Sequence, residues 1–394
     1  MRRCVLFLTT LIVINTIFLS TLSAESNDLP SIESEAAIIM EAESGQILYK
    51  KNANSQMYPA SLTKIITAIY AIENADLNDM VTISSNASAK NIEGTTVFLE
   101  KGEKDRLEKL IKGLLINSGN DAGVAIAEYV SGSEEQFSED INDYLENVIG
   151  VEHTHLKNPH GLFDPEHVTT AEDLAKVTKY AMENETFAEI FGTKEMEWDG
   201  KAWDTTLITH HKLLKGEIPY ENITGGKTGF VNESGYTLTT TAQNDDLSLI
   251  VITLKSNDSN GAYEDTINLL NYGFDHYKTS YIAEDTSFTI EGDNYITPKK
   301  LAYTHLLNNE IDKRVTTNGE LVIANEDEEI IHSFKLTKMD SKEEKLPNGS
   351  DNENIENQDE VQLNYIALGQ QLVVPTLILI VIGYFYRKVK KFFI

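Results

Sequence analysis

The sequence predicts an α/β fold built on an antiparallel sheet with an inserted block of helices. Short apolar runs at residues 36–40 and 46–49, and again at 236–242 and 247–254, are typical of strands separated by turns. The long segment between the two pairs shows apolar residues at helical spacing instead. Strands therefore open and close this part of the chain, and the helices are inserted within one sheet.

The individual elements follow from local patterns. The first two strands flank Glu43-Ser44-Gly45, which predicts a β-hairpin. The first helix is expected over 61–72, where apolar side chains recur every three or four positions. The later pair of strands is joined by a turn at 244–246. Further helical patterns cover residues 107–116, 122–130, 134–148, 171–182 and 263–277.

The sequence pattern changes from helical to strand-like after the last of these helices. Residues 281–338 contain short β-like runs at 287–290, 321–323 and 330–336, separated by charged turns, and predict a small β-rich second domain. Residues 339–362 are acidic and polar with few apolar groups. Because such a segment cannot bury enough surface to fold, we expect a flexible stalk.

Both ends of the chain predict targeting segments. Residues 1–24 have a basic start, an apolar stretch and small residues before Glu25, as in a secretory signal peptide. An uncleaved anchor helix is the alternative. Residues 366–386 are apolar and long enough to span a membrane, with an amphipathic surface helix as the alternative. The basic tail 387–394 predicts a cytoplasmic end. We expect a single-pass protein of the cell membrane with its folded part outside the cytoplasm.

Composition excludes several classes of function. The chain has 394 residues with Lys+Arg 33 against Asp+Glu 62, a formal net charge of −29. Such a surface repels phosphate backbones, so no nucleic-acid partner is expected. The single cysteine, Cys4, excludes a disulfide framework and a cysteine metal site. The histidine pairs 153/155 and 210/211 lack metal-site spacing, so we predict surface or loop roles for them, no metal and no cofactor.

Three short motifs carry the chemistry. They are Ser61-Leu62-Thr63-Lys64 at a helix start, Ser118-Gly119-Asn120 between two helices, and Lys227-Thr228-Gly229, predicted to start a strand after a Gly-Gly pair. Each motif alone is weakly to moderately specific. The ordered combination, each in a fitting local context, favours one active site over three unrelated local features.

The residue types in these motifs suit nucleophilic catalysis. Positions i and i+3 of a helix share a face, so the Ser61 hydroxyl lies beside a Lys64 base. Burial and a nearby Lys227 cation lower the pKa of such a lysine. Ser118 can relay a proton to a leaving amine, and Asn120 can bond both Lys64 and a substrate amide. The remaining roles fall to the third motif: Thr228 for a terminal carboxylate, the strand at Lys227–Gly229 for a peptide docked edge-on, and the N–H groups of Ser61 and Phe230 for an oxyanion hole.

With these motifs in place, the chain resembles the serine-type D-alanyl-D-alanine carboxypeptidases, the low-molecular-weight penicillin-binding proteins. The likeness covers roughly residues 33–278, and more loosely the β-rich part to about 338. It implies a penicillin-binding/β-lactamase-like fold, an acyl-enzyme that removes the last D-alanine from peptidoglycan stem peptides, and covalent capture of β-lactams. It extends beyond the trio to the segments 59–64, 117–122, 158–162, 169–174 and 225–229.

The sequence departs from this family at several points. Val231 follows Phe230 where many relatives have threonine, and Ala262 lies where an arginine is often found near the substrate carboxylate. That leaves Thr228 and Lys227 to hold the carboxylate. The segment 209–214 has threonine and histidines where asparagines are frequent.

Some assignments stay open at this point. Asp173 either orients a deacylating water or belongs to a helix cap with Thr170, and the cap is favoured. A serine β-lactamase is the first alternative function, although the glutamate element E-x-x-L-N expected after the second motif is missing. An inactive wall-binding scaffold is the second, although the motif residues are intact.

Overall fold

The computed structural model describes residues 29–339. Apart from residue 339, the predicted signal peptide, acidic stalk, membrane helix and cytoplasmic tail lie outside these residues. Within 29–339, no helix has the length and apolar character needed to cross a membrane.

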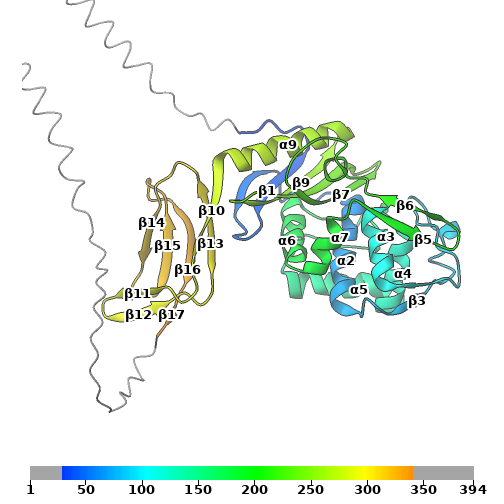
Figure 1. The fold of residues 1–394 in the computed structure, drawn as a ribbon, viewed down its shortest axis with the longest axis horizontal. Helices are drawn as coiled ribbons and strands as arrows, with labels where there is room; N and C mark the ends of the chain where they lie inside the picture. Colours follow the sequence, from blue (N-terminus) through cyan, green and yellow to red (C-terminus); the bar gives the residue numbers. More distant parts are fainter. Residues whose placement is uncertain (1–28, 340–394) are drawn as a thin grey trace, which may run out of the picture. The chain divides into compact units, whose positions relative to one another are not determined.

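A five-stranded antiparallel sheet is the centre of the larger part of the structure (Figure 1). The predicted hairpin forms its edge, and the spatial order β2-β1-β9-β8-β7 brings both ends of the segment together, as the sequence predicts. The strand of the third motif differs from its prediction. It begins at Ile223 rather than at Lys227, so Lys227 lies in the middle of a strand. The bounds are β1 Ala36–Glu41, β2 Ile47–Lys51, β7 Ile223–Val231, β8 Gly235–Gln243 and β9 Ser248–Ser256.

Helices cover both faces of this sheet (Figure 1). Successive side chains of a strand point to opposite faces, so Ile38 and Met40 pack with the helical block while Ala37 and Ile39 pack with α9 residues such as Leu269. The predicted helices 107–116 and 171–182 are confirmed at both ends. The helix bounds are α2 Thr63–Asn74, α3 Leu107–Ile116, α4 Asn120–Ser131, α5 Glu134–Tyr144, α6 Ala171–Met182, α7 Glu185–Phe191, α8 Lys212–Lys215 and α9 Ser259–His276.

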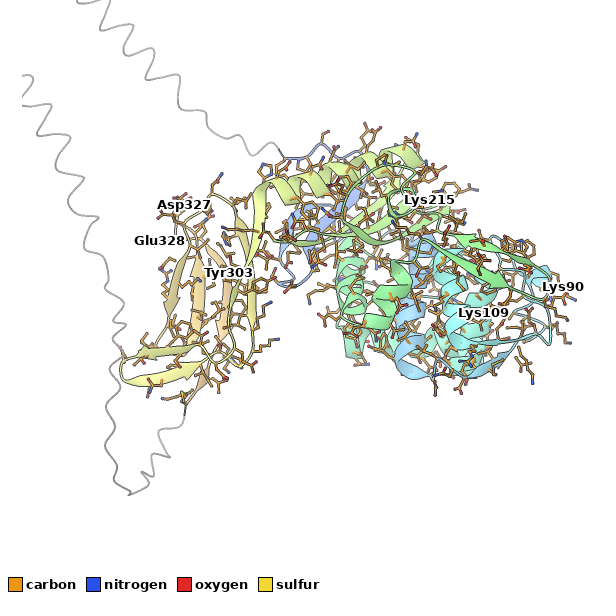
Figure 2. The ribbon with its side chains drawn as sticks, viewed as in Figure 1. Lys90, Lys109, Lys215, Tyr303, Asp327 and Glu328 are labelled. Carbon is orange, nitrogen blue, oxygen red and sulfur yellow. The ribbon has the colours of Figure 1, made fainter. Side chains whose placement is uncertain are left out.

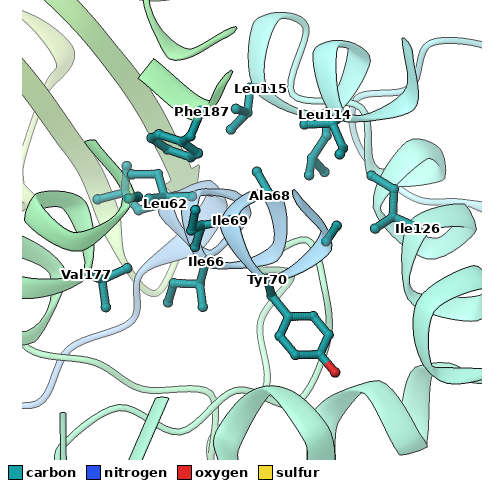
Figure 3. Packing of buried hydrophobic residues seen from close by; sticks show 14 of the residues in the cluster. Leu62, Ile66, Ala68, Ile69, Tyr70, Leu114, Leu115, Ile126, Val177 and Phe187 are labelled. Carbon is teal, nitrogen blue, oxygen red and sulfur yellow. The ribbon is translucent and has the colours of Figure 1, made fainter. Parts of the chain in front are cut away.

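The helix α2 is the centre of the helical block, and neighbouring elements surround it (Figure 3). Every residue from Thr63 to Ala71 is buried, so these first nine residues of the helix present no face to solvent. Its polar side chains Thr63 and Thr67 are buried too, and their hydroxyls donate to the carbonyls of Ala60 and Pro159. The side chain of Lys64, near the start of this helix, is therefore buried in the interior.

Several shorter elements escaped prediction from the sequence. The two-stranded sheets β3–β4 and β5–β6 and the helices α7 and α8 are too short to show a clear period. Trp198 of β5 is fully buried and lies against Gly113, where an added Cβ would come within 3.0 Å of its ring. Their bounds and those of the irregular turns are β3 Met80–Thr82, β4 Lys104–Arg106, β5 Glu195–Asp199, β6 Asp204–Ile208, 3₁₀ turns Ala60–Leu62 and Ala89–Asn91, and a π-turn Leu145–Ile149 that continues α5.

The β-rich part predicted after residue 280 is present, and its first strand directly follows α9. It contains three small antiparallel sheets around one apolar cluster that includes Tyr295, Leu321 and Ile323. Its strands are β10 Tyr277–Ile282, β11 Ser287–Ile290, β12 Asp293–Ile296, β13 Leu301–Leu306, β14 Asp312–Val315, β15 Glu320–Ala324, β16 Ile330–Lys335 and β17 Thr337–Lys338.

Candidate active site

The first motif places its hydroxyl and its amine in contact. Ser61 lies in the 3₁₀ turn 60–62, and Lys64 lies in the first turn of α2 that follows. The Nζ atom of Lys64 is 2.8 Å from the Ser61 Oγ atom. The predicted i, i+3 pairing is therefore present, although the hydroxyl sits just before α2 rather than within it.

Lys64 is buried, and among the residues described no carboxylate lies within ion-pair distance of its amine. The side chain is fully buried, and its Nζ atom also donates to the backbone carbonyl of His160 at 2.6 Å. Burial, with the nearby Lys227 cation as a second cause, holds the pKa of Lys64 well below its usual value, and Asp121 opposes the shift. A neutral amine beside a hydroxyl is a base in position to take its proton.

The carbonyl of His160 belongs to a loop that sequence reasoning recognised only as a family-like segment. Gly161 has φ +87°, and a Cβ there would collide with the carbonyl group of Ala60. Ala60 itself adopts φ +48°, a rare conformation for a residue with a side chain. The loop and the turn before Ser61 are thus fitted against each other, and the strain is stored next to the nucleophile.

The second and third motifs meet at another hydroxyl–amine pair. The Nζ atom of Lys227 donates to Ser118 Oγ at 3.1 Å, and Ser118 is held at φ +63°. Lys227 is 3% exposed, and burial lowers its pKa to about 7. Since this value lies near neutrality, the amine can either give or take a proton under ordinary conditions.

Asn120 has a different partner from the one predicted. Its side-chain amide donates to the carbonyl of Glu93 at 2.7 Å, and no bond joins it to Lys64 within residues 29–339. The next residue, Asp121, is fully buried and accepts from the N–H groups of Val97 and Leu99. This motif therefore fastens the segment 93–99 beside the site, and contact of Asn120 with substrate stays a prediction.

The strand β7 passes directly beside the nucleophile. A Cβ at Gly229 would lie 2.9 Å from the backbone N of Ser61 and would collide with the Thr237 hydroxyl. Thr228 is half-buried and Phe230 is 51% exposed, so both are accessible along this strand. The structure thus brings the third motif to Ser61 through Gly229, in agreement with the sequence prediction of one active site.

The Gly-Gly pair before Lys227 is not a turn. Both residues are part of β7, and both are pressed by rings: a Cβ at Gly225 would collide with Phe191, and one at Gly226 with His211. The His211 ring bonds to the Thr240 hydroxyl at 2.9 Å and accepts from the N–H of Leu214. The glycines thus allow the strand to lie flat against buried side chains.

The four histidines of the two close pairs lie outside the helices and named strands, as predicted. His153, His155 and His210 are exposed, whereas His211 is buried. Burial lowers the pKa of His211 to about 3, and the Lys227 cation adds to this, so the ring is neutral. Among the residues described, no group of three or more His, Cys, Asp or Glu side chains is placed to hold a metal ion.

Asp173, in the first turn of α6, binds the loop that contains His153 and Thr154. The hydroxyl of Thr170 accepts from the backbone N–H of Asp173 at 3.0 Å, which is the predicted helix cap. The Asp173 carboxylate is buried and accepts from the N–H of His153 and the hydroxyl of Thr154. All of these contacts are to protein groups that position the start of α6.

Solved structures share this architecture. Penicillin binding protein 5 from Haemophilus influenzae superimposes with a TM-score of 0.72 at 24% identity, over 79% of this chain and 98% of that one. Penicillin binding protein 6B from Escherichia coli gives a TM-score of 0.67 at 26% identity, over 80% of this chain and 98% of that one. The fold and the two hydroxyl–amine pairs define a serine–lysine site on a penicillin-binding-protein fold.

Sequence comparison gives the family. The D-alanyl-D-alanine carboxypeptidase model matches residues 23–258, which is more than half of the chain. D-alanyl-D-alanine carboxypeptidase DacF of Bacillus subtilis is 33% identical over 256 residues, covering 63% of this chain and 64% of that protein. DacD of Escherichia coli is 31% identical over 264 residues, covering 64% and 66% respectively. The match thus spans just under two thirds of these relatives. The chain belongs to the D-alanyl-D-alanine carboxypeptidase family.

Proposed function

We propose that the protein is a serine D-alanyl-D-alanine carboxypeptidase that removes the terminal D-alanine from peptidoglycan stem peptides through an acyl-enzyme. The observation that carries this proposal is the 2.8 Å contact between a fully buried Lys64 amine and the Ser61 hydroxyl. It is supported by the second pair, Lys227 and Ser118, on the strand that passes the nucleophile. β-Lactams, which carry a reactive amide in place of the dipeptide bond, are expected to acylate the same hydroxyl.

Acylation begins with a proton transfer. The lone pair of neutral Lys64 takes the Ser61 proton as Oγ bonds to the carbonyl carbon of the penultimate D-alanine. The His160 carbonyl accepts one N–H of Lys64 throughout, which keeps the amine aimed. The N–H groups of Ser61 and Phe230 are assigned to the developing oxyanion, because Gly229 lets β7 approach the nucleophile.

The leaving group needs a proton of its own. As the C–N bond breaks, Lys227 supplies a proton through the Ser118 hydroxyl to the amine of D-alanine, which leaves as the free amino acid. A pKa of about 7 makes the Lys227 ammonium able to donate near neutrality. Thr228, one residue further on, is assigned to the terminal carboxylate of the peptide.

Deacylation restores both lysines. Water attacks the ester carbon and its proton returns to Lys227 by way of Ser118, while Lys64 gives its proton back to Ser61 Oγ. The products are the shortened stem peptide and the starting enzyme. No cofactor enters this sequence of steps.

The cellular setting is part of the proposal. A signal peptide at 1–24 and a membrane helix at 366–386 would export the folded part and tether it beside its polymeric substrate. Both segments lie outside the described residues. A chain labelled at either end and probed with protease on intact cells tests this arrangement, since only an exported body is cleaved.

A fluorescent penicillin and a pentapeptide ending in D-Ala-D-Ala test the chemistry. We expect stable labelling of the wild-type chain, release of free D-alanine, and loss of both in Ser61→Ala. Rapid drug turnover would assign a β-lactamase instead. Absence of labelling in a folded wild-type protein would favour the scaffold reading.

A further inference from the structure

A cavity lined by none of the residues assigned to the reaction lies where the β1–β2 turn meets α6 and the β-rich part. Its volume is about 390 Å³, which is within the range of small-molecule sites. The turn contributes Glu43 and Ser44, and α6 contributes Lys179. The β-rich part contributes Tyr281, Lys299, Lys300, His332 and Phe334, among others.

The charge of this cavity is opposite to that of the chain. Three lysines and one glutamate line it, in a protein with a formal charge of −29. Elsewhere in the β-rich part, acidic residues such as Asp327 and Glu328 lie at the turn between β15 and β16 (Figure 2). Burial lowers the pKa of His332, so its ring adds no charge. Among the residues that line the cavity, ammonium groups therefore outnumber carboxylates.

The lysines differ in how far they are already neutralised. Lys179 forms a short ion pair with Glu183, at 2.6 Å. Lys300 is 3.9 Å from Glu43, at the outer limit of an ion pair. Within residues 29–339, Lys299 has no carboxylate partner. Two of the three ammonium groups can thus accept an anion without losing a strong ion pair.

The wall of the cavity is held in place before any ligand arrives. Lys300 lies 3.6 Å from the centre of the Tyr281 ring, and the Tyr281 hydroxyl donates to Glu43 at 2.9 Å. Glu41 is fully buried, and one of its oxygens accepts from the N–H groups of Glu43 and Ser44. A site whose side chains are already ordered loses less entropy on binding.

We infer that this cavity binds carboxylate groups of the wall polymer at a distance from the bond that is cleaved. The inference rests on the proposed function, which gives the enzyme a polymer carrying free carboxylates. A chain charged −29 repels such a polymer as a whole, so binding requires local sites of opposite sign. Lys299 and Lys300 supply that sign, and the apolar surface of Phe334 suits a carbon skeleton rather than a bare ion.

Binding of soluble wall fragments tests the inference. The full chain carrying Ser61→Ala is titrated with uncrosslinked glycan–peptide fragments at low salt, with and without Lys299→Gln plus Lys300→Gln. We expect about tenfold weaker binding in the double lysine variant and a steep loss of affinity with added salt. Lys278→Gln plus Lys335→Gln is the matched control, because both lysines are in the β-rich part and neither lines the cavity. Equal affinity of the two double variants would overturn the site.

Separate titrations identify which carboxylate binds. A labelling control distinguishes failure of this inference from failure of the proposed function. Peptide-free glycan and free stem peptide are titrated in turn, and the one that reproduces the lysine-dependent binding supplies the group. Tighter lysine-dependent binding of a phosphate polymer than of either would overturn the carboxylate assignment. In chains with Ser61 intact, penicillin labelling and D-alanine release from a short peptide are expected to be equal in both double variants. Loss of wild-type labelling would instead count against the proposed function itself.

Discussion

The active-site part and the β-rich part use lysine in opposite ways. Lys64 and Lys227 are buried, and among the residues described neither has a carboxylate within ion-pair distance. Lys300 and Lys338 of the β-rich part are more than half exposed and face Glu43 and Asp293. An unpaired buried ammonium opposes folding, whereas an exposed ion pair is nearly neutral for stability. Buried lysines without a carboxylate partner are typical of sites that need a neutral amine. Lys64 and Lys227 therefore mark the active site independently of any sequence motif.

The largest effect is expected when the amine of Lys64 is removed. Lys64→Met keeps the length of the side chain and removes the base, so penicillin labelling is expected to slow by about 10⁴-fold. Because the substitution also removes a buried amine, the midpoint of thermal unfolding is expected to stay or rise. Lys112→Met is the control, since Lys112 is half-buried on α3 and pairs with Glu108. Labelling at the wild-type rate in Lys64→Met would remove Lys64 from the mechanism.

The packing of the loop behind Lys64 gives the next effect. In Gly161→Ala the new Cβ collides with the Ala60 carbonyl, so the His160 carbonyl and the turn before Ser61 must move. We expect about 100-fold slower labelling and a loss of about 3 kcal/mol in the free energy of unfolding. Gly102→Ala is matched in backbone, with φ +79°, but nothing lies within 4 Å of its added Cβ. It should cost about 1 kcal/mol and leave labelling unchanged; equal rates for both variants would mean that the contact with Ala60 is unimportant.

The β-rich part should show the reverse pattern. Leu321 is fully buried in its apolar cluster, and Leu321→Ala is expected to cost about 3 kcal/mol. Hydrogen exchange should accelerate in residues 277–339, while penicillin labelling keeps its rate. Ile330→Ala, at a position that is 63% exposed, is the control and should change neither measurement. A loss of labelling in Leu321→Ala would show that the two parts are energetically one unit.

The two parts also differ in how far the sequence predicts them. The helices α3 and α6, the first hairpin and the contact of Ser61 with Lys64 follow from periodicity and motif spacing. The contact of Ser118 with Lys227 joins two motifs that are 109 residues apart, and their spacing does not predict it. The strands of the β-rich part contain no motif. Their short apolar runs predict where strands lie in the sequence but not which strands pair with each other.

The remaining features of the site depend on contacts between distant segments. The His160 carbonyl is a backbone group, so its bond to Lys64 leaves no trace in residue type. In the sequence the Gly-Gly pair resembles a turn. The structural need for these glycines is the close packing of the Phe191 and His211 rings against β7, and both rings come from other segments of the chain. The burial of His211 and the bond of Asn120 to Glu93 are invisible for the same reason.

The smallest effect is one of pH, and it isolates the second buried lysine. In the folded protein the pKa of Lys227 is about 7, against a usual value of 10.5. Between these values the unfolded chain binds a proton at this side chain and the folded chain does not. Folding therefore releases a proton there, and the contribution of Lys227 to stability rises with pH, fully present above 10.5 and lost as pH falls to 7.

Lys227→Met removes this dependence while keeping the length of the side chain. The difference in unfolding free energy, wild type minus variant, should rise by about 2 kcal/mol between pH 7.5 and 9 and level off below 7. Urea unfolding of both chains across this range measures it, and other titrating groups cancel because the two chains share them. A difference that is flat or falls with pH would mean that Lys227 is charged in the fold at pH 9. The proton that reaches the leaving D-alanine through Ser118 would then need another source.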